Sequence, residues 1–263
     1  MEKTETTIFV DWENLLADLK AIQETDERLK EPNFSFNDPD QLLALIRSFL
    51  EPEEELKRIY FYVSEPFTEA EPRIKGNKNE ELEEYKEKNP KDYEKRVHKS
   101  ENIQEFNGNI AQQNQVKLRV GRVKFKFVYK FEDKEVYNGL EAKIFIPYLK
   151  LRQKQVDALL AHDITKLYCT KQGGCILLFS RDTDFVPVLE AAWEKGFEVF
   201  IANIQESPIS VPSDLKKSCG VRECSVAEIV AKLPKSQHTP KKKNFPPNEP
   251  FNNPFKDQLF KKN

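Results

Sequence analysis

The sequence lacks a hydrophobic run long enough to cross a membrane, and its first ten residues contain no apolar segment of the signal-peptide type. We therefore expect a cytoplasmic protein that does not enter a membrane. It also lacks an excess of charge of either sign, because 42 Lys+Arg stand against 44 Asp+Glu and the net charge is -2. The chain as a whole does not attract polyanions, so any binding of nucleic acid must come from local groups of basic side chains.

Sulfur and imidazole ligands are scarce, since the 263 residues include four cysteines and three histidines. Cys169 and Cys175 are separated by five residues, and Cys219 and Cys224 by four. These spacings differ from the short knuckles of zinc ribbons, so reduced and buried thiols are favoured over a structural zinc. His162 is flanked by core-like leucines, and we interpret it as a structural or surface imidazole rather than a general base.

Strand-like and helix-like hydrophobic segments alternate along the chain. The strand-like runs lie at residues 7–10, 58–63, 175–180 and 197–202. A hydrophobic content of 38% is sufficient for one enzyme-sized core. The alternation predicts a Rossmann-like α/β fold, in which helices cover both faces of a mostly parallel central sheet. The predicted helices cover residues 15–22, 39–50, 154–168, 188–193, 213–217 and 226–233.

Three segments depart from this alternation. Residues 71–115 are dominated by Glu, Lys, Asn and Gln, which indicates a charged insertion of one or two solvated helices. Residues 116–137 alternate between apolar and polar side chains and predict an antiparallel β-hairpin that returns near 131–134. Residues 234–263 are rich in Pro, Asn and Lys without periodicity, so we expect a disordered basic tail after a folded domain of residues 5–233.

Acidic residues follow two of the strand-like runs. Asp11 ends the first run, and Asp182 follows the run at 175–180. Open α/β sheets place their sites beyond the carboxyl ends of the strands, where both carboxylates are expected. The helix that includes Asp157 returns to the start of the 175–180 strand, so its N-terminus is expected at the same edge. Each aspartate alone is more typical of a loop or a helix N-cap, and it is the coincidence of all three that indicates a site.

Three converging carboxylates without matching basic residues repel one another, and each raises the pKa of the others unless a divalent cation neutralises them. Carboxylate oxygens favour Mg²⁺ or Mn²⁺ over metals that prefer sulfur. These ions activate water and stabilise charge during the hydrolysis of phosphodiesters. The acidic residues therefore predict a metal-dependent nuclease site.

Other polar residues near these positions allow more than one interpretation. Asn14 either orients the first carboxylate or a bound water, or caps the first helix. Asp184 either caps the helix that follows it or orients a metal ligand. Glu65 follows the 58–63 strand and is a plausible fourth carboxylate, whereas Asp163 is a weak candidate because it lies about a third of a turn away from the helix face of Asp157.

The sequence resembles the NYN domain family of PIN-like nucleases. The segment 8–15 (IFVDWENL) resembles the D-x-x-N opening of the family, 154–157 (KQVD) resembles its K-x-V-D helix start, and 180–185 (SRDTDF) resembles its S-x-D-x-D-F loop. D-x-x-N alone would be weak, but the three motifs in this order are specific. The resemblance covers most of residues 5–233 and leaves 71–115 as an insertion.

The resemblance implies that Asp11, Asp157 and Asp182 bind the metal ion. It gives Asn14 and Asp184 supporting roles beside them. Together, these five residues are the expected catalytic group.

Two residues depart from the family pattern. Trp12 stands where small residues are common after the first aspartate, and we expect its bulk to narrow access to the site. Arg181 also stands where a small residue is frequent, and we expect it to clamp a substrate phosphate or partly occupy the place of the metal. Lys154 is a further, weaker candidate for contact with a substrate phosphate.

These observations predict a ribonuclease that hydrolyses single-stranded or structured RNA with Mg²⁺ or Mn²⁺. The alternative is an RNA-binding or regulatory module of the same fold without turnover, which would use the basic hairpin with Lys124, Lys126 and Lys130 and the aromatic Phe125 and Phe127. A small-molecule phosphohydrolase is disfavoured, because the first strand ends in Asp-Trp-Glu rather than the Asp-x-Asp that an aspartyl-phosphate mechanism needs. The sequence does not indicate an oligomeric state.

Overall fold

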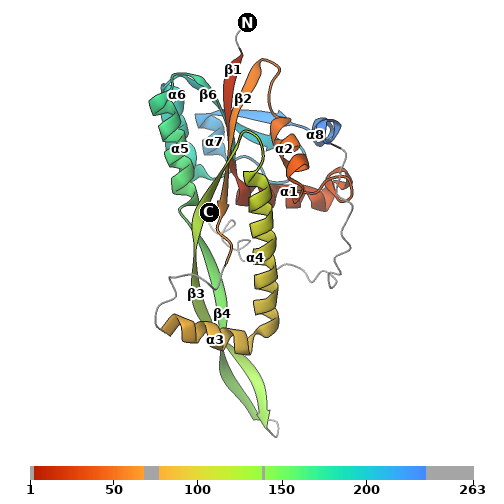
Figure 1. The fold of residues 1–263 in the computed structure, drawn as a ribbon, viewed down its shortest axis with the longest axis vertical. Helices are drawn as coiled ribbons and strands as arrows, with labels where there is room; N and C mark the ends of the chain where they lie inside the picture. Colours follow the sequence, from red (N-terminus) through yellow and green to blue (C-terminus); the bar gives the residue numbers. More distant parts are fainter. Residues whose placement is uncertain (1–2, 68–76, 138–139, 235–263) are drawn as a thin grey trace.

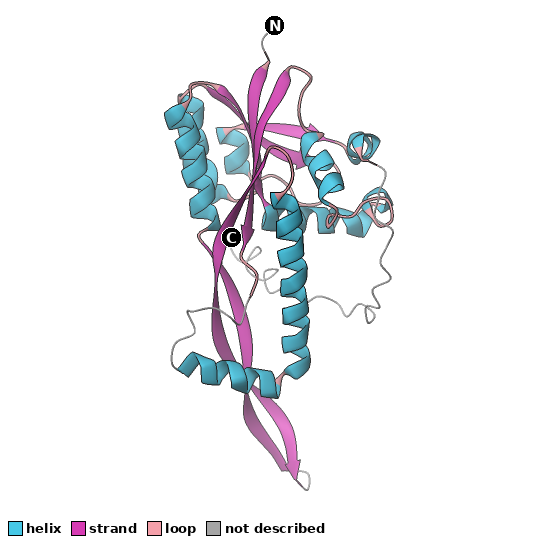
Figure 2. Cartoon of the chain, in the orientation of Figure 1, coloured by secondary structure: helices cyan, strands magenta, loops and turns pink. Residues whose placement is uncertain are grey.

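The computed structural model describes residues 3–67, 77–137 and 140–234, which form one seven-stranded sheet with helices on both faces (Figures 1 and 2). The strands are β1 (Thr4–Asp11), β2 (Glu54–Ser64), β3 (Val116–Tyr137), β4 (Leu140–Lys154), β5 (Gly174–Phe179), β6 (Phe197–Ile204) and β7 (Gly220–Cys224). Their order across the sheet is β4-β3-β2-β1-β5-β6-β7. All neighbours are parallel except β3 and β4, which confirms the predicted mostly parallel α/β fold.

The helices divide between two apolar cores, one on each face of the sheet. Helices α1, α2, α4 and α8 pack on the face of β1 that carries Ile8 and Val10. Helices α5, α6 and α7 pack on the face that carries Phe9. Adjacent residues of a buried strand point to opposite faces, so β1 contributes to both cores. The helices and 3-10 segments are α1 (Trp12–Thr25), η1 (Glu27–Leu29), α2 (Pro39–Arg47), α3 (Asn77–Lys88), α4 (Pro90–Ala111), α5 (Val156–Thr170), η2 (Thr183–Phe185), α6 (Val186–Glu194), α7 (Ser213–Ser218) and α8 (Val226–Lys232).

Helix starts follow local capping chemistry. At α2, Asp38 Oδ1 accepts hydrogen bonds from the backbone N–H groups of Asp40 (3.0 Å) and Gln41 (3.3 Å), and Pro39 is the first helical residue. Proline suits that position because the backbone N–H that it lacks would have no partner within the helix. None of the described helices has the length and apolar character needed to cross a membrane.

The charged insertion contains two helices in its described part, where the sequence predicted one or two. Its longer helix, α4, reaches the main core through Phe106 and Ile110. The shorter helix, α3, packs against the β3–β4 hairpin in a separate small core. Residues 71–76 of the expected insertion lie outside the described residues. The small core consists of Phe67, Leu82, Tyr85, Phe127 and Leu149.

The hairpin is longer than the sequence suggested, and the predicted return at 131–134 is wrong. Those residues continue β3 and pair with residues 142–145 of β4. Charged residues in this stretch resemble a turn, but they are equally compatible with an exposed strand. The strands are instead separated by Asn138-Gly139, a dipeptide typical of two-residue hairpin turns, which lies outside the described residues.

The junction between β4 and α5 also differs from the prediction. Lys154 ends β4 rather than beginning the helix, and Gln155 adopts a left-handed conformation with φ 74° before α5 begins at Val156. This turn packs tightly against β3 at Gly121, where an added Cβ would lie 2.4 Å from Val156 Cγ2 and 2.9 Å from the Lys154 carbonyl oxygen. Glycine at position 121 is therefore required for the close approach.

Two further expectations concern the end of the chain. The short helices predicted at 213–217 and 226–233 are confirmed by α7 and α8, but the intervening strand β7 was not predicted. The expected tail falls, apart from Pro234, outside the described residues, so its disorder stays a prediction.

We predict that Gly121→Ala lowers the free energy of unfolding by about 1–3 kcal/mol, because the new methyl group overlaps the β4–α5 turn. Gly108→Ala is the matched control, since no atom lies within 4 Å of a Cβ at that exposed position in α4. The control should raise stability by about 0.5–1 kcal/mol through helix propensity. Urea unfolding of both variants measures the difference, and effects of the same sign would contradict the steric explanation.

Candidate active site at the carboxyl edge of the sheet

Asp11 lies at the end of β1 and caps α1, and its side chain is buried with 3% exposure. Asn14 Nδ2 donates a hydrogen bond to Asp11 Oδ2 at 2.5 Å, and the Asn14 backbone N–H lies 3.5 Å from Asp11 Oδ1. Ser180, directly after β5, donates its hydroxyl to the same Oδ2 at 3.2 Å. The carboxylate is therefore fixed from two segments that are far apart in the sequence. The side chain of Asn14 orients Asp11, while the capping role belongs to Asp11 itself.

The loop after β5 is held in a complementary way. The Asp182 N–H donates to Ser180 Oγ at 3.2 Å, and the Asp184 N–H donates to Asp182 Oδ1 at 2.9 Å. Asp182 thus caps η2, whereas Asp184 lies within η2 and is exposed. The Arg181 N–H lies 3.4 Å from Asn14 Oδ1, which adds a second link between this loop and α1. Ser180 bridges Asp11 and Asp182, a role that its place in the SRDTDF motif did not reveal.

Asp157 lies in the first turn of α5, on the open side of the site. Burial raises the pKa of Asp11 to about 6, and the nearby charge of Asp157 adds to this while the hydrogen bonds from Asn14 and Ser180 oppose it. Burial also raises the pKa of Asp157, and the charges of Asp182 and Asp184 raise it further. The four carboxylates therefore share one electrostatic environment at the edge where the sequence placed them.

Carboxylate oxygens are the ligands that a hard divalent cation prefers. These four carboxylates are available for that role, because they form no ion pair with a basic side chain within the described ranges. However, no three acidic, histidine or cysteine side chains of those ranges stand close enough together to hold one ion. Repulsion between uncompensated carboxylates favours such a separation. Asp157 and Asp184 are exposed and keep the rotamer freedom needed to turn toward a cation.

Arg181 has a structural role in this arrangement. Its guanidinium donates to Asp18 Oδ2 at 2.5 Å and to Asn203 Oδ1 at 3.1 Å, and the Ser207 hydroxyl also donates to Asp18. The Arg181 and Asp18 side chains are 11% and 10% exposed, so the pair is nearly buried. The sequence did not suggest this ion pair. It compensates the positive charge of Arg181, whose guanidinium pairs with Asp18 rather than with any of the four carboxylates. The expected contact of Arg181 with a substrate phosphate stays a prediction.

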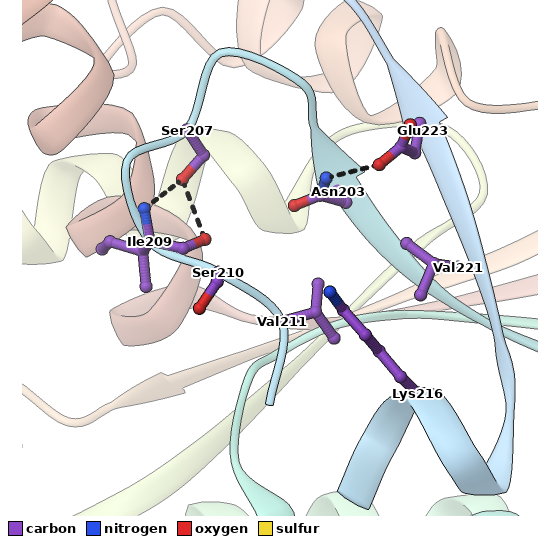
Figure 3. Close-up of a pocket in the computed structure, with 8 residues that line it drawn as sticks. All are labelled: Asn203, Ser207, Ile209, Ser210, Val211, Lys216, Val221 and Glu223. Atoms are coloured by element: carbon purple, nitrogen blue, oxygen red, sulfur yellow. Dashed lines mark hydrogen bonds between the residues drawn. The ribbon is translucent and has the colours of Figure 1, made fainter. Parts of the chain in front are cut away.

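A pocket of about 440 Å³ adjoins this ion pair on the side of β6 and β7 (Figure 3). Asn203 joins the two regions, because it accepts from Arg181 and its amide donates to Glu223 Oε1 at 3.1 Å. The Ser207 hydroxyl accepts from the Ile209 N–H at 3.1 Å and shapes the loop at the pocket rim. The pocket is lined by Asn203, Ser207, Ile209, Ser210, Val211, Lys216, Val221 and Glu223.

Trp12 lies in the core, where it does not fulfil the expectation that it narrows the site. Its indole stacks on Phe106 of α4 at 5.0 Å and packs against Phe61 of β2 at 5.4 Å between ring centroids. Its exposed fraction is 9%. The bulky residue after Asp11 therefore anchors the inserted helix α4 to the sheet.

The remaining sequence candidates serve the scaffold. Asp163 is buried and accepts from Arg119 Nε at 2.6 Å and from the Tyr62 hydroxyl at 2.9 Å, which fastens α5 to β2 and β3. Glu65 Oε1 accepts from the Val123 N–H at 2.9 Å and holds the root of the hairpin.

His162 is exposed on α5. All four cysteines are free thiols, and Cys175 and Cys224 are buried.

Comparison with known protein families identifies the family to which this fold belongs. A family model described as the NYN domain matches residues 5–222. The chain belongs to the NYN domain family. NYN domains are PIN-like nucleases that act on nucleic acids, and PIN-like nucleases usually use divalent metals, so this NYN domain has the fold of a nuclease family. No curated protein and no solved structure matched the chain in the other two comparisons.

The raised pKa of Asp11 predicts a pH-dependent cost in stability. Its folded pKa of about 6 exceeds its ordinary value of 3.8, so the fold loses stability as the pH rises from about 3.8 to about 6. Without metal and in EDTA, Asp11→Asn should gain about 2–3 kcal/mol relative to the wild type between pH 4 and pH 8. Urea unfolding at both pH values measures this gain.

Glu194→Gln is the control for that measurement, because Glu194 is exposed at the end of α6, at the opposite edge of the sheet. Its difference from the wild type should change little between the two pH values. A pH-independent difference for Asp11→Asn would show that burial does not disfavour the charged carboxylate.

Proposed function

We propose that this NYN domain is a metal-dependent ribonuclease. The observation that carries the proposal is the buried Asp11, held by Asn14 and Ser180 beside the acidic residues Asp157 and Asp182. Their charges lack basic partners among the described residues, and a divalent cation is the simplest compensation. Membership of a family of PIN-like nucleases supports the same assignment.

In the proposed mechanism, Asp11, Asp157 and Asp182 would hold Mg²⁺ or Mn²⁺, and the ion supplies an activated water and charge stabilisation when bound. Asn14 and Ser180 orient the buried carboxylate by hydrogen bonding, so that it needs little reorganisation. The backbone N–H of Asp184 restrains Asp182 in the same way. Lys154, at the end of β4 and three residues before Asp157, would contact a substrate phosphate.

We predict that Asp11→Asn and Asp182→Asn each reduce RNA cleavage on the order of 100-fold or more, because each removes a charged ligand of the proposed ion. The measurement is a titration of Mn²⁺ and Mg²⁺ against cleavage of a labelled single-stranded RNA. Glu194→Gln, which removes one exposed carboxylate at the far edge of the sheet, should cleave like the wild type. Equal RNA loss with all four proteins would remove the ribonuclease proposal.

Ser180→Ala gives a test of positioning that does not remove a carboxylate. It deletes the hydroxyl that donates to Asp11 and accepts from the Asp182 N–H. We expect the metal concentration for half-maximal cleavage to rise or activity to fall by about 10–100-fold. Ser180→Thr retains the hydroxyl and should recover part of the loss. If alanine and threonine gave the wild-type metal dependence, the bridge would have no functional role.

The alternative is an RNA-binding module of the same fold without turnover. It is favoured by one observation: the carboxylates are not gathered within the distances of a common coordination shell in the described part of the chain. RNA binding in EDTA together with no metal-stimulated cleavage would support this alternative. Release of phosphate from a small ester without RNA cleavage would instead indicate a phosphohydrolase.

A further inference from the structure

The backbone register of the hairpin brings basic residues face to face across β3 and β4. Residues that are directly opposite in an antiparallel pair project from the same face, and alternate residues share that face. By this backbone register, three successive rows pair a basic residue with another basic residue. The rows with described side chains are Arg122 with Lys154 and Lys126 with Lys150, and the backbone register places Lys124 opposite Arg152 between them. The next two positions pair Val128 with Tyr148 and Lys130 with Ile146.

The opposite face of the hairpin is apolar and covered. Phe127 and Leu149, which form a cross-strand pair one residue away from the Lys126 row, are buried against Leu82 and Tyr85 of α3. Asn89 Nδ2 also donates to the Pro147 carbonyl oxygen at 2.9 Å from the turn between α3 and α4. The hairpin is therefore amphipathic, and the basic rows lie on the face that α3 leaves uncovered.

The basic rows carry an electrostatic cost. Like charges directly opposite each other on one face destabilise a sheet. Arg122, Lys126 and Lys150 are exposed, and no carboxylate of the described ranges forms an ion pair with them or with Lys154. Lys130 Nζ lies 4.9 Å from the centre of the Tyr148 ring, so the final cation rests on an aromatic face. An external polyanion would relieve the repulsion along the whole face.

The first basic row lies close to the candidate active site in the chain. Lys154 and Arg122 lie where the hairpin leaves the sheet. Lys154 is three residues before Asp157, and Arg122 directly follows Gly121. Figure 1 shows β3 and β4 continuing beyond the other strands, away from the edge at which β1 begins. The hairpin thus extends from the same edge of the sheet that carries Asp11 and Asp182.

We propose that this basic face of the β3–β4 hairpin is a track for the phosphate backbone of single-stranded RNA. Successive rows are separated by about 6.8 Å, since each strand residue advances about 3.4 Å. Five rows, from Arg122 to Lys130, extend about 27 Å along an extended polynucleotide. A single strand fits better than an RNA duplex, because an extended backbone can follow a straight line of cations whereas the phosphates of an A-form duplex wind around its axis.

The choice of RNA as the polyanion rests on the proposed function, but the binding itself requires no cleavage. The experiment therefore measures the affinity of the full chain for labelled oligouridylate and oligoadenylate in EDTA across a range of salt concentrations. The test variant is the double substitution Lys126→Gln and Lys150→Gln, which removes one exposed row far from the carboxylates. The control is Lys166→Gln with Lys195→Gln, which removes two exposed positive charges from α5 and the end of α6.

The row variant should bind both oligonucleotides more weakly, and the slope of log K against log salt should decrease in magnitude by about 1.4, or about 0.7 for each lost phosphate contact. The control should retain the wild-type slope. Because removing opposed like charges relieves repulsion, the row variant should melt at or above the wild-type temperature, which separates lost binding from unfolding.

An unchanged slope in the row variant would overturn the proposal, as would tight binding to phosphatidylserine vesicles without binding to either oligonucleotide. Metal-dependent RNA cleavage with an unchanged slope would overturn the track while leaving the ribonuclease proposal intact. The reverse outcome, with a reduced slope and no cleavage by the wild type, would retain the track and reject the enzyme.

Discussion

The hydrogen bond between Ser180 and Asp11 joins the end of β5 to the end of β1, and the remainder of the candidate site is arranged around it. Parallel strands bring these two chain segments to the same edge, but proximity alone does not orient a carboxylate. Ser180 does so by donating to Asp11 and accepting from the backbone of Asp182. A hydroxyl can make both bonds at once, whereas an alkyl side chain would leave the buried carboxylate less well compensated.

The position of Asp157 depends on a second, independent set of contacts. Helix α5 is fastened to the sheet by the buried Asp163, which binds Arg119 and Tyr62 on neighbouring strands. The close approach at Gly121 then fixes the turn that leads into the helix. Removing one partner of a buried ion pair leaves an uncompensated charge, so loss of Arg119 or Asp163 would destabilise the packing of α5 on the sheet. Asp163 therefore supports the scaffold, whereas Asp157 on the same helix is exposed.

The architecture and the edge that carries the carboxylates could be predicted because they follow from local patterns. Apolar runs that end in Asp11 and Asp182 indicate parallel strands and their carboxyl ends, whatever the detailed packing. The three NYN motifs indicated the family for the same reason, and the match over residues 5–222 confirms it.

Features that depend on distant partners were not predictable in this way. The partners Arg119 and Asp163 are 44 positions apart, and Arg181 and Asp18 are 163 positions apart. The strand β4 was not predicted, because its charged residues indicate a strand only when their pairing with β3 is known. The helix start was placed at Lys154 because local periodicity does not reveal the left-handed residue Gln155.

The contact between Trp12 and Phe106 has a mechanical consequence for the hairpin. An isolated two-stranded hairpin is only marginally stable. Here α4, which spans about 33 Å over its 22 residues, connects the indole of Trp12 with the turn between α3 and α4, where Asn89 bonds to the hairpin. The residue that holds the core end of α4 is therefore Trp12, which directly follows Asp11. The contact that supports the hairpin through α4 and the buried carboxylate of Asp11 thus belong to adjacent residues of the chain.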